Sequence, residues 1–360
     1  MRGQLYNAAS VNLEYDTIEP LCNRAKLDTG TLCNYRCGFC YYFDKLTELT
    51  PIDTIKARVD YLIKCGITEV DLSGGESSVH PNWFDILDYC SERKLHISTL
   101  SNGYKFADVE FMRRSQRKGL REILFSLHGY DKDSHNTLVG NKHGYDKIIQ
   151  AIKNAHSLGI MVRINCTVTH DNYEFLPTKF ADLIRELQPF EVNFLTLNYW
   201  GDAHNQQHID YALVTPAIHR AIDNMREYVP VINVRYTPYC FMVGYEQYVC
   251  NYYQHIYDVY DWNIAVYDGT LNPEEYTNNK IAHLYNAAKR NRLHTYYKKP
   301  ECVGCKYYFL CDGVEKQIAD VNLLPVAGER ITQVNFFRKG WYSGHNSNKW
   351  RDRVSRNVGV

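Results

Sequence analysis

The chain has 360 residues, with 41 Lys+Arg against 41 Asp+Glu, so its formal net charge is zero. Hydrophobic residues make up 45% and charged residues 23% of it, a globular composition rather than a disordered or collagen-like one. Without a basic excess, nucleic acid is not expected as the main partner, because binding to a polyanion needs a strong positive field.

No apolar stretch of the sequence approaches the roughly 20 residues that span a bilayer, and the first residues lack the apolar core of a secretory signal. We therefore expect a cytoplasmic protein with no membrane partner, where thiols stay reduced. The 12 cysteines of the chain then indicate metal ligands, redox groups or buried apolar residues rather than disulfides.

Strands and helices are predicted to alternate as far as residue 200. Strands are expected at 25–29, 69–73, 96–100, 122–127, 160–168 and 192–197. Helices are expected at 50–65, 82–93, 107–118, 145–158 and 176–187, the first with Thr50 as its cap. Six strands separated by five helices predict a parallel sheet with right-handed crossovers and with its chemistry at the carboxyl ends of the strands.

Beyond residue 200 this alternation stops. A polar stretch at 201–210 resembles a linker, 216–228 fits a helix and 231–236 fits a strand. We expect an N-terminal extension (1–22), an α/β core domain (23–200), a smaller α+β domain (201–338) and a polar tail (339–360).

A first group of cysteines, Cys33, Cys37 and Cys40, follows the first predicted strand. Three thiolates at this spacing can converge on one loop. Structural zinc usually takes four ligands and stays an alternative, whereas a cubane iron–sulfur cluster held by three cysteines leaves one iron free for an outside ligand. The run Gly74-Gly75-Glu76 follows the second predicted strand.

These residues resemble the radical S-adenosylmethionine (SAM) superfamily, whose cluster motif is CxxxCxφC with an aromatic φ, here Phe39, and whose second signature is a Gly-Gly-Glu run. The similarity covers about residues 27–197. It implies a partial (β/α)6 TIM-like barrel at 23–200, with SAM and a 4Fe–4S cluster as cofactors. One electron from the reduced cluster, supplied by a donor such as flavodoxin or ferredoxin, would cleave SAM to a 5′-deoxyadenosyl radical that abstracts hydrogen from substrate.

The resemblance also implies roles for single residues. Glu76 would accept a hydrogen bond from the SAM ammonium, Gly74 and Gly75 would let backbone approach the ligand, and Phe39 would pack near the adenine. Polar residues at the ends of the third to fifth strands would hold the ribose and carboxylate, unless they only make local hydrogen bonds. These residues are Ser101, Asn102, Ser126, His128 and Asn165.

A second group of cysteines, Cys302, Cys305 and Cys311, resembles the SPASM and Twitch extensions, which hold auxiliary iron–sulfur clusters. Five cysteines lie beyond residue 200, enough for one cubane but not for two. We favour Cys240 as the fourth ligand over Cys250; zinc is the alternative metal. A spare Cys250 could donate a hydrogen atom in an epimerisation, or it could be a structural residue.

The resemblance implies an enzyme of oxidoreductase or isomerase type. We expect oxidation or epimerisation of a small molecule, such as a sugar, an aminocyclitol or a nucleoside-like metabolite. The alternative is a maturase that modifies a ribosomal peptide by a thioether, a carbon–carbon crosslink or epimerisation. We rank it second because only 32 residues precede Cys33, too few for the winged-helix peptide-recognition domain that many such enzymes carry. A remote alternative is a zinc-binding protein without enzymatic activity.

Overall fold

A computed structural model describes residues 21–42, 46–197, 209–267, 269–318 and 321–341. Its centre is a seven-stranded sheet in which each strand pairs in parallel with the next one along the chain. The strands are β1 (Arg24–Asp28), β2 (Glu69–Ser73), β3 (His96–Ser101), β4 (Leu120–Ser126), β5 (Met161–Val168), β6 (Glu191–Thr196) and β7 (Val231–Arg235). The curled sheet confirms the expected half-barrel.

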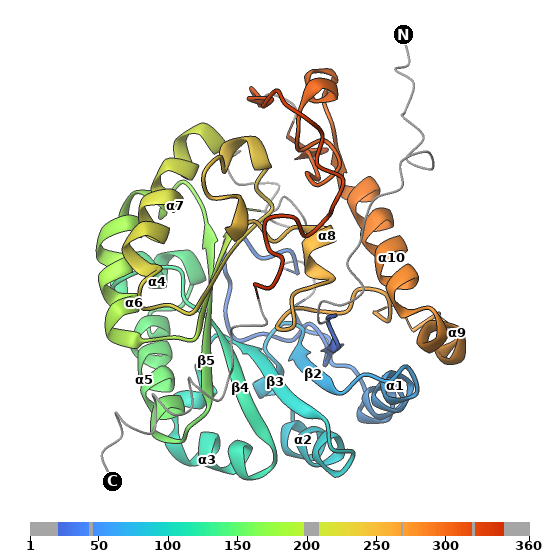
Figure 1. Cartoon of the computed structure of the whole chain (residues 1–360). Helices are drawn as coiled ribbons and strands as arrows, with labels where there is room; N and C mark the ends of the chain where they lie inside the picture. The colour runs from blue at the N-terminus through green and yellow to red at the C-terminus, as the bar shows by residue number, and fades with distance from the viewer. Residues whose placement is uncertain (1–20, 43–45, 198–208, 268, 319–320, 342–360) are drawn as a thin grey trace.

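Helices connect successive strands on the outer side of the sheet (Figure 1). They are α1 (Ile52–Lys64), α2 (Trp83–Glu92), α3 (Val109–Arg117), α4 (Lys132–Val139), α5 (Gly144–Ser157), α6 (Ala181–Leu187) and α7 (Tyr211–Met225). The residue before α1 is Pro51 rather than the expected cap Thr50, and no side chain caps this helix end. Helix α4 was not foreseen.

The sheet extends one strand further than the six that the sequence predicts. Strand β7 pairs with β6, with Asn193 opposite Asn233, and α7 is the crossover between the two. Both elements come from the segment assigned above to the C-terminal domain, so the barrel sheet continues beyond residue 200. The polar stretch 201–208, the tail from 342 and most of the N-terminal extension lie outside the described residues.

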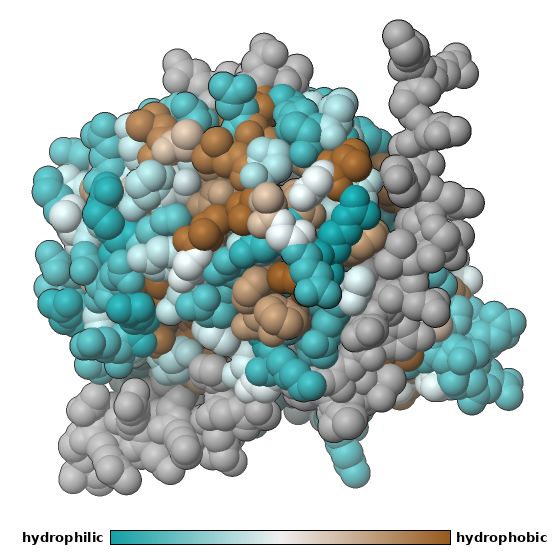
Figure 2. Space-filling view, turned by 45° about the horizontal axis from the view of Figure 1, so that its top comes forward, coloured by the Kyte–Doolittle hydropathy of each residue, from teal (hydrophilic) through white to brown (hydrophobic). Residues whose placement is uncertain are grey.

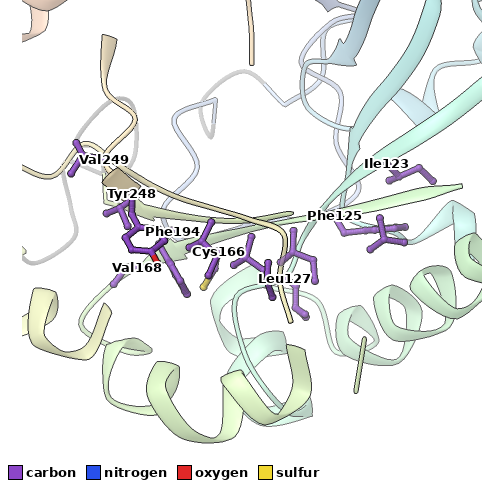
Figure 3. Packing of buried hydrophobic residues seen from close by; sticks show 14 of the residues in the cluster. Ile123, Phe125, Leu127, Cys166, Val168, Phe194, Tyr248 and Val249 are labelled. Carbon is purple, nitrogen blue, oxygen red and sulfur yellow. The ribbon is translucent and has the colours of Figure 1, made fainter. Parts of the chain in front are cut away.

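The two faces of the sheet differ in polarity because alternate residues of a strand point to opposite sides. The outer face is apolar and packs against the helices: Ile123 and Phe125 of β4, Cys166 of β5 and Phe194 of β6 are fully buried there (Figure 3). The buried Cys65 and Cys90 belong to the same core. These three isolated cysteines therefore act as packing residues, which is common for free thiols.

The inner face of the sheet carries buried charges instead. Arg24 of β1 bridges Glu69 of β2 and Glu122 of β4, with N–O distances of 2.7 and 2.8 Å. Arg163 of β5 bonds Glu191 of β6 at 2.7 Å. Such pairs near the amino ends of the strands fill the interior there with matched charges, so the carboxyl ends remain as the place for a ligand.

The segment from Val249 to Trp262 closes the gap between the two edge strands. Val249 makes a parallel bridge to Val234 of β7, and Trp262 makes one to Arg24 of β1. The short helix α8 (Tyr252–His255) lies between these two contacts, and it covers the inner side of the sheet in Figure 1. The half-barrel is thus completed by a segment that is mostly not a strand.

The remaining chain forms a smaller α+β unit. It contains α9 (Pro273–Asn278), α10 (Lys280–Thr295) and the antiparallel pair β8 (Tyr296–Tyr297) and β9 (Val314–Glu315). Within the described residues, no helix has both the length and the apolar character needed to cross a membrane. Figure 2 shows hydrophobic and hydrophilic residues interspersed on the face that carries the top of Figure 1.

Candidate active site

The loop between β1 and α1 carries Cys33, Cys37 and Cys40 close together. The backbone N–H of Cys40 donates to the Cys37 carbonyl at 3.1 Å, and the Cys33 N–H donates to the Leu46 carbonyl at 3.3 Å. Burial raises the pKa of the Cys33 thiol to about 11, with further contributions from Glu76 and Cys40. Burial also raises the pKa of Cys37, and the other two thiols raise it further. The three thiols thus lie near enough to one another to affect each other's pKa.

Helix α4 holds this loop from the side. The Arg36 N–H donates to the Val139 carbonyl and the Gly38 N–H to the Leu138 carbonyl, both at 3.2 Å. Helix α4 ends with Gly140 at φ +61°, where an added Cβ would lie 2.4 Å from the Arg36 carbonyl oxygen. The signal for α4 was present in the sequence, since Asp131 and Ser134 form a capping box and Gly140 is a typical C-cap.

Gly74 and Gly75 let the loop after β2 pack directly on the cysteine loop. An added Cβ at Gly74 would lie 2.0 Å from the Gly30 carbonyl oxygen, and one at Gly75 would lie 2.2 Å from that of Thr31. The Gly75 N–H donates to the Gly30 carbonyl at 2.9 Å. The close approach that these glycines permit in this structure is therefore between two protein loops; their approach to a ligand stays a prediction.

Glu76 is 3% exposed and follows these glycines directly. One of its oxygens, Oε1, accepts from the hydroxyls of Ser78 at 2.5 Å and Ser101 at 2.9 Å, and Oε2 accepts from the Asn102 N–H at 2.7 Å. Burial raises the pKa of Glu76, and these hydrogen bonds oppose the rise. The carboxylate is fixed in place, with an acceptor position left on Oε2, which holds one of the bonds that a carboxylate oxygen can accept.

Asn102 links the end of β3 to the cysteine loop. Its Nδ2 donates to Asn34 Oδ1 at 2.8 Å and lies 4.0 Å from Cys33 Sγ. Its Oδ1 accepts from the Tyr104 N–H at 3.0 Å. Both of the residues predicted at this strand end, Ser101 and Asn102, thus lie beside Glu76 and the first cysteine.

Phe39 and His128 are in edge-to-face contact, with ring centroids 4.7 Å apart. His128 Nδ1 accepts from the Thr167 N–H at 3.0 Å, so the proton of a neutral His128 ring is on Nε2. Burial lowers the pKa of His128 well below its usual range, and His135 adds to the effect. His128 is therefore a neutral Nε2–H donor. Nothing in the sequence marks the role of Thr167, which acts through its backbone.

Ser126, the last residue of β4, lies opposite Asn165, which is in the middle of β5 rather than at the strand end where it was expected. Both are half-buried. The Asn165 carbonyl accepts from the Leu127 N–H at 3.0 Å. Both residues are on the inner face of the sheet, together with the charged residues described above. Their contact with a ligand stays a prediction.

The second group of cysteines surrounds a cavity of about 350 Å³, including its open mouth. The thiols that line it come from Cys240, Cys302, Cys305 and Cys311. Gly313 turns the chain beside it at φ +93°, where an added Cβ would meet the Tyr297 carbonyl oxygen at 2.1 Å. This is the set of four that the sequence analysis favoured for an auxiliary cluster, brought together from two distant segments.

Backbone N–H groups point at the sulfurs of this cavity. Val326 N–H donates to Cys305 Sγ and Gly313 N–H to Cys311 Sγ, each at 3.4 Å. Burial raises the pKa of Cys240 to about 12, and the nearby Cys311 adds to it. Lys298 also lines the cavity, and burial together with Arg292 lowers its pKa to about 7. Lys298 was not foreseen, although it lies close before Cys302 in the chain.

Cys250 is fully buried and is not among the residues lining that cavity. Its Sγ lies 3.4 Å from Asp258 Oδ2, and one ligand atom each of Cys250, His255 and Asp261 lie within 4.8 Å of one another. Arg235 occupies this cluster, because its Nη1 contacts both His255 Nε2 and Asp261 Oδ2. A guanidinium already balances these groups, so we assign no metal to them, and the role of Cys250 as hydrogen donor stays a prediction.

Comparison with curated proteins gives relatives of low identity. AlbA of Bacillus subtilis, an antilisterial bacteriocin subtilosin biosynthesis protein, is 24% identical over 225 residues, which cover 59% of this chain and 49% of AlbA. A probable GTP 3′,8-cyclase of Thermococcus kodakarensis is 29% identical over 158 residues, 43% of this chain and 50% of the cyclase. The chain spans about half the length of the curated relatives it matches.

A solved structure is similar over almost the whole chain. It is native anSMEcpe with bound AdoMet and Kp18Cys peptide, with a TM-score of 0.52 and 15% identity, covering 93% of this chain and 100% of that one. At this identity the likeness concerns the fold. The profile of the radical SAM superfamily matches residues 27–178, which include the cysteine loop and Gly74-Gly75-Glu76. Over these residues the chain matches the radical SAM superfamily, whose members are enzymes.

Proposed function

We propose that this enzyme modifies a peptide. It would hold a SAM-binding 4Fe–4S cluster on Cys33, Cys37 and Cys40 and one auxiliary 4Fe–4S cluster on Cys240, Cys302, Cys305 and Cys311. A one-electron donor such as flavodoxin or ferredoxin would supply the electron. The observation that carries the catalytic part is the cysteine loop, in which Cys33 lies near enough to the fixed carboxylate of Glu76 for that carboxylate to raise the pKa of the thiol.

The donor set of the first site fits a cluster with one free coordination position. Three thiols leave the fourth iron of a cubane for an outside ligand, and SAM offers an amino and a carboxylate group for it. Oε2 of Glu76 accepts one protein hydrogen bond, from the Asn102 N–H, and can accept another from an ammonium. His128 offers a neutral Nε2–H beside Phe39. When bound, the cluster and SAM would supply the radical; these residues orient SAM and keep its ammonium charged.

The donor set of the second site fits a closed cluster. Four thiols satisfy all the irons of one cubane, and backbone N–H groups donate to at least two of the sulfurs. Hydrogen bonds to sulfur raise the reduction potential of such clusters. When bound there, such a cluster would supply electron transfer, with all four of its protein ligands coming from these thiols.

Two comparisons support a peptide rather than the small molecule favoured by the sequence alone. AlbA, by its name, takes part in the biosynthesis of a bacteriocin. The anSMEcpe structure holds a peptide, and its likeness extends over the C-terminal part of this chain as well as the barrel. The match to the GTP cyclase covers 43% of this chain, so it supports only the shared barrel.

Iron and zinc analysis tests the metal assignments. Anaerobic reconstitution should give a brown protein with about eight Fe from two cubanes. A colourless protein with stoichiometric zinc would refute the enzyme proposal and restore the zinc-binding alternative. A content of about four Fe would contradict the auxiliary cluster and leave the assignment of the SAM-binding cluster in place.

Isotope transfer tests the substrate class. The enzyme is incubated with SAM and dithionite, together with either a tryptic digest of a fully deuterated bacterial proteome or a pool of deuterated sugars and nucleosides. Abstraction from a peptide gives monodeuterated 5′-deoxyadenosine with the digest, detected by mass spectrometry. Deuterium that comes only from the small-molecule pool, or from neither, contradicts the peptide proposal.

A further inference from the structure

Lys298 is the one basic side chain among the described residues that line the second cysteine cavity. It lies between β8 and Cys302 in the chain and belongs to no motif of the sequence. Its ammonium lies over the ring of Tyr308, another residue of the lining, with Nζ 4.0 Å from the ring centroid. A cation–π contact of this kind holds the end of a flexible lysine side chain in place. The charge of Lys298 is therefore fixed at the wall that also carries the thiols.

The antiparallel pair of β8 and β9 brings Lys298 next to Cys311. Tyr297 of β8 is paired with Val314 of β9. The residues that adjoin this pair, Lys298 and Gly313, lie side by side, because an added Cβ at Gly313 would be 3.2 Å from Lys298 Cγ. The Gly313 N–H in turn donates to Cys311 Sγ at 3.4 Å. Gly313 thus packs against the stem of the lysine and bonds the sulfur of a cysteine in the same cavity.

Arg292 carries a second positive charge near these cysteines, but a carboxylate balances it. Its guanidinium donates to the carbonyls of Phe309 at 3.1 Å and Cys311 at 2.7 Å, and its Nε is 3.5 Å from Asp312 Oδ1. Lys298, by contrast, forms no ion pair with a carboxylate within the described parts of the chain. Its charge is thus available to interact with whatever the four thiols hold.

An ammonium beside such a cluster has a defined effect on its chemistry. A cubane held by four thiolates has a net negative charge, which increases when the cluster takes up an electron. A nearby cation therefore stabilises the reduced form more than the oxidised form. Burial and Arg292 lower the pKa of Lys298, and Cys311 and Asp312 oppose this effect. An anionic cluster would add to that opposition, because a nearby negative charge favours the ammonium.

We infer that Lys298 raises the reduction potential of the auxiliary cluster, so that this cluster can take up an electron. This rests on the proposed function for the presence of a cluster on Cys240, Cys302, Cys305 and Cys311. One electron passes from a one-electron donor, such as reduced flavodoxin, to the cluster, and no covalent bond forms or breaks. Lys298 supplies no ligand to iron and acts through its charge alone.

The potential is measured in the Cys33→Ala chain, so that the iron that remains belongs to the second site. Lys298→Met keeps most of the stem and removes the charge, Lys298→Gln is a second neutral variant, and Lys298→Arg keeps the charge. Each protein is reconstituted anaerobically and titrated with dithionite in the presence of redox mediators. The reduced cluster is quantified by electron paramagnetic resonance at each potential, and iron is measured in parallel.

Both neutral variants should make the cluster harder to reduce. We expect the equilibrium constant for reduction to fall about tenfold, which lowers the potential of a one-electron couple by about 59 mV. Lys298→Arg should stay within about threefold of the chain that has lysine at this position. The matched control is Lys316→Met, which removes an exposed charge of the same unit whose Nζ donates to the Leu293 carbonyl at 2.8 Å. It should also stay within about threefold, because solvent screens an exposed charge.

The two proposals fail in different ways. A Cys33→Ala chain that holds no cluster refutes the auxiliary cluster and the role of Lys298 with it. A cluster whose potential is the same in the neutral variants as with lysine, or one that Lys316→Met shifts equally, refutes the role of Lys298 and leaves the auxiliary cluster in place. Loss of iron in both neutral variants also overturns this role, because the lysine would then serve assembly of the cluster. None of these results depends on the substrate.

Discussion

The two cysteine sites of this chain are constructed differently. The first takes its three thiols from one short loop, between Cys33 and Cys40, and surrounds them with side chains that carry charge or a polar N–H, namely Glu76, Asn102 and His128. The second takes four thiols from segments more than 60 residues apart; backbone N–H groups donate to two of these sulfurs, and Lys298 is the charged side chain in the cavity lining.

Under the proposed function, this difference would separate a site that binds SAM from one that only holds a cluster. A free coordination position is useful only where other groups can recognise what fills it, and the first site has polar groups of that kind. The second site offers four thiols, which would satisfy one cubane with protein ligands alone. The following variants, in order of decreasing effect, test how far this contrast holds.

Cys33→Ala should abolish SAM cleavage. Two remaining thiols cannot retain a cubane that needs three. We expect 5′-deoxyadenosine below detection with dithionite, and iron reduced by about four per chain. The matched control is Cys90→Ala, a fully buried cysteine of the outer core, which should lose stability and keep its activity. Cleavage that persists in Cys33→Ala refutes the first site.

Cys240→Ala and Cys250→Ala should differ in iron content. The first removes a thiol that lines the second cavity, and we expect about four Fe where the wild type holds about eight. The second removes a thiol beside Asp258 and should keep about eight Fe. The reverse result would show that Cys250 is the fourth ligand. SAM cleavage should survive in both, because the first site is untouched.

Glu76→Gln should weaken SAM binding more than it weakens the fold. A hydrogen bond to a charged group contributes about 1.5–3 kcal/mol, so we expect the Kd for SAM to rise about 10- to 100-fold. In the variant, the NH₂ group of the glutamine would face either the Asn102 N–H or the serine hydroxyls. Both of these are groups that donate hydrogen bonds to Glu76 in the wild type. Binding is measured by calorimetry on the reconstituted protein, with the exposed Glu174→Gln as control. Equal affinities would contradict the role of Glu76.

Mild acid should lower the stability of the fold by protonating a buried histidine near the first site. His135 lies behind His128, and burial lowers its pKa to about 4. An unfolded histidine titrates near 6.5, so the unfolded chain binds more protons below that pH, and stability is lost as the pH falls. Between pH 6.5 and 5.5 we expect His135 to cost about 1 kcal/mol, because the unfolded histidine is already half protonated at pH 6.5.

Chemical denaturation of wild type and His135→Asn at both pH values isolates this contribution. The variant should lose about 1 kcal/mol less than wild type over the interval, whatever its stability at pH 6.5. Histidines remote from residue 135 titrate equally in both proteins and cancel, and burial, the largest cause of the low pKa of His128, keeps that neighbour neutral in both. An identical loss in the two proteins means that His135 is not buried as a neutral ring.

The sequence predicted the strands well because the outer face requires an apolar residue at every second position. Strand β2, expected at 69–73, is Glu69–Ser73, and the other strands differ by one or two residues at their ends. The charges on the inner face follow the same alternation, as in Arg24 and Lys26, yet the pairing of Arg24 with Glu122 depends on how the strands are arranged in the sheet. Sequence periodicity carries no such long-range information.

The motif residues of the candidate site could be predicted from the sequence, whereas the residues that hold them in position could not. Cys33, Cys37, Cys40 and Glu76 are recognisable by spacing, and their local backbone brings them together. Thr167 contributes only a backbone N–H to His128, so its side chain gives no signal. The preference for Cys240 over Cys250 agrees with the lining of the second cavity, although only the folded chain places Cys240 beside Cys311.

The contact between the two glycines and the cysteine loop links assembly of the cluster to the SAM site. The Gly75 and Glu76 amides donate to the carbonyls of Gly30 and Leu32, which lie directly before Cys33. Anything that orders this loop therefore also slows hydrogen exchange at those two amides. Amide exchange at positions 75 and 76 would thus report cluster loading from residues that bind no iron.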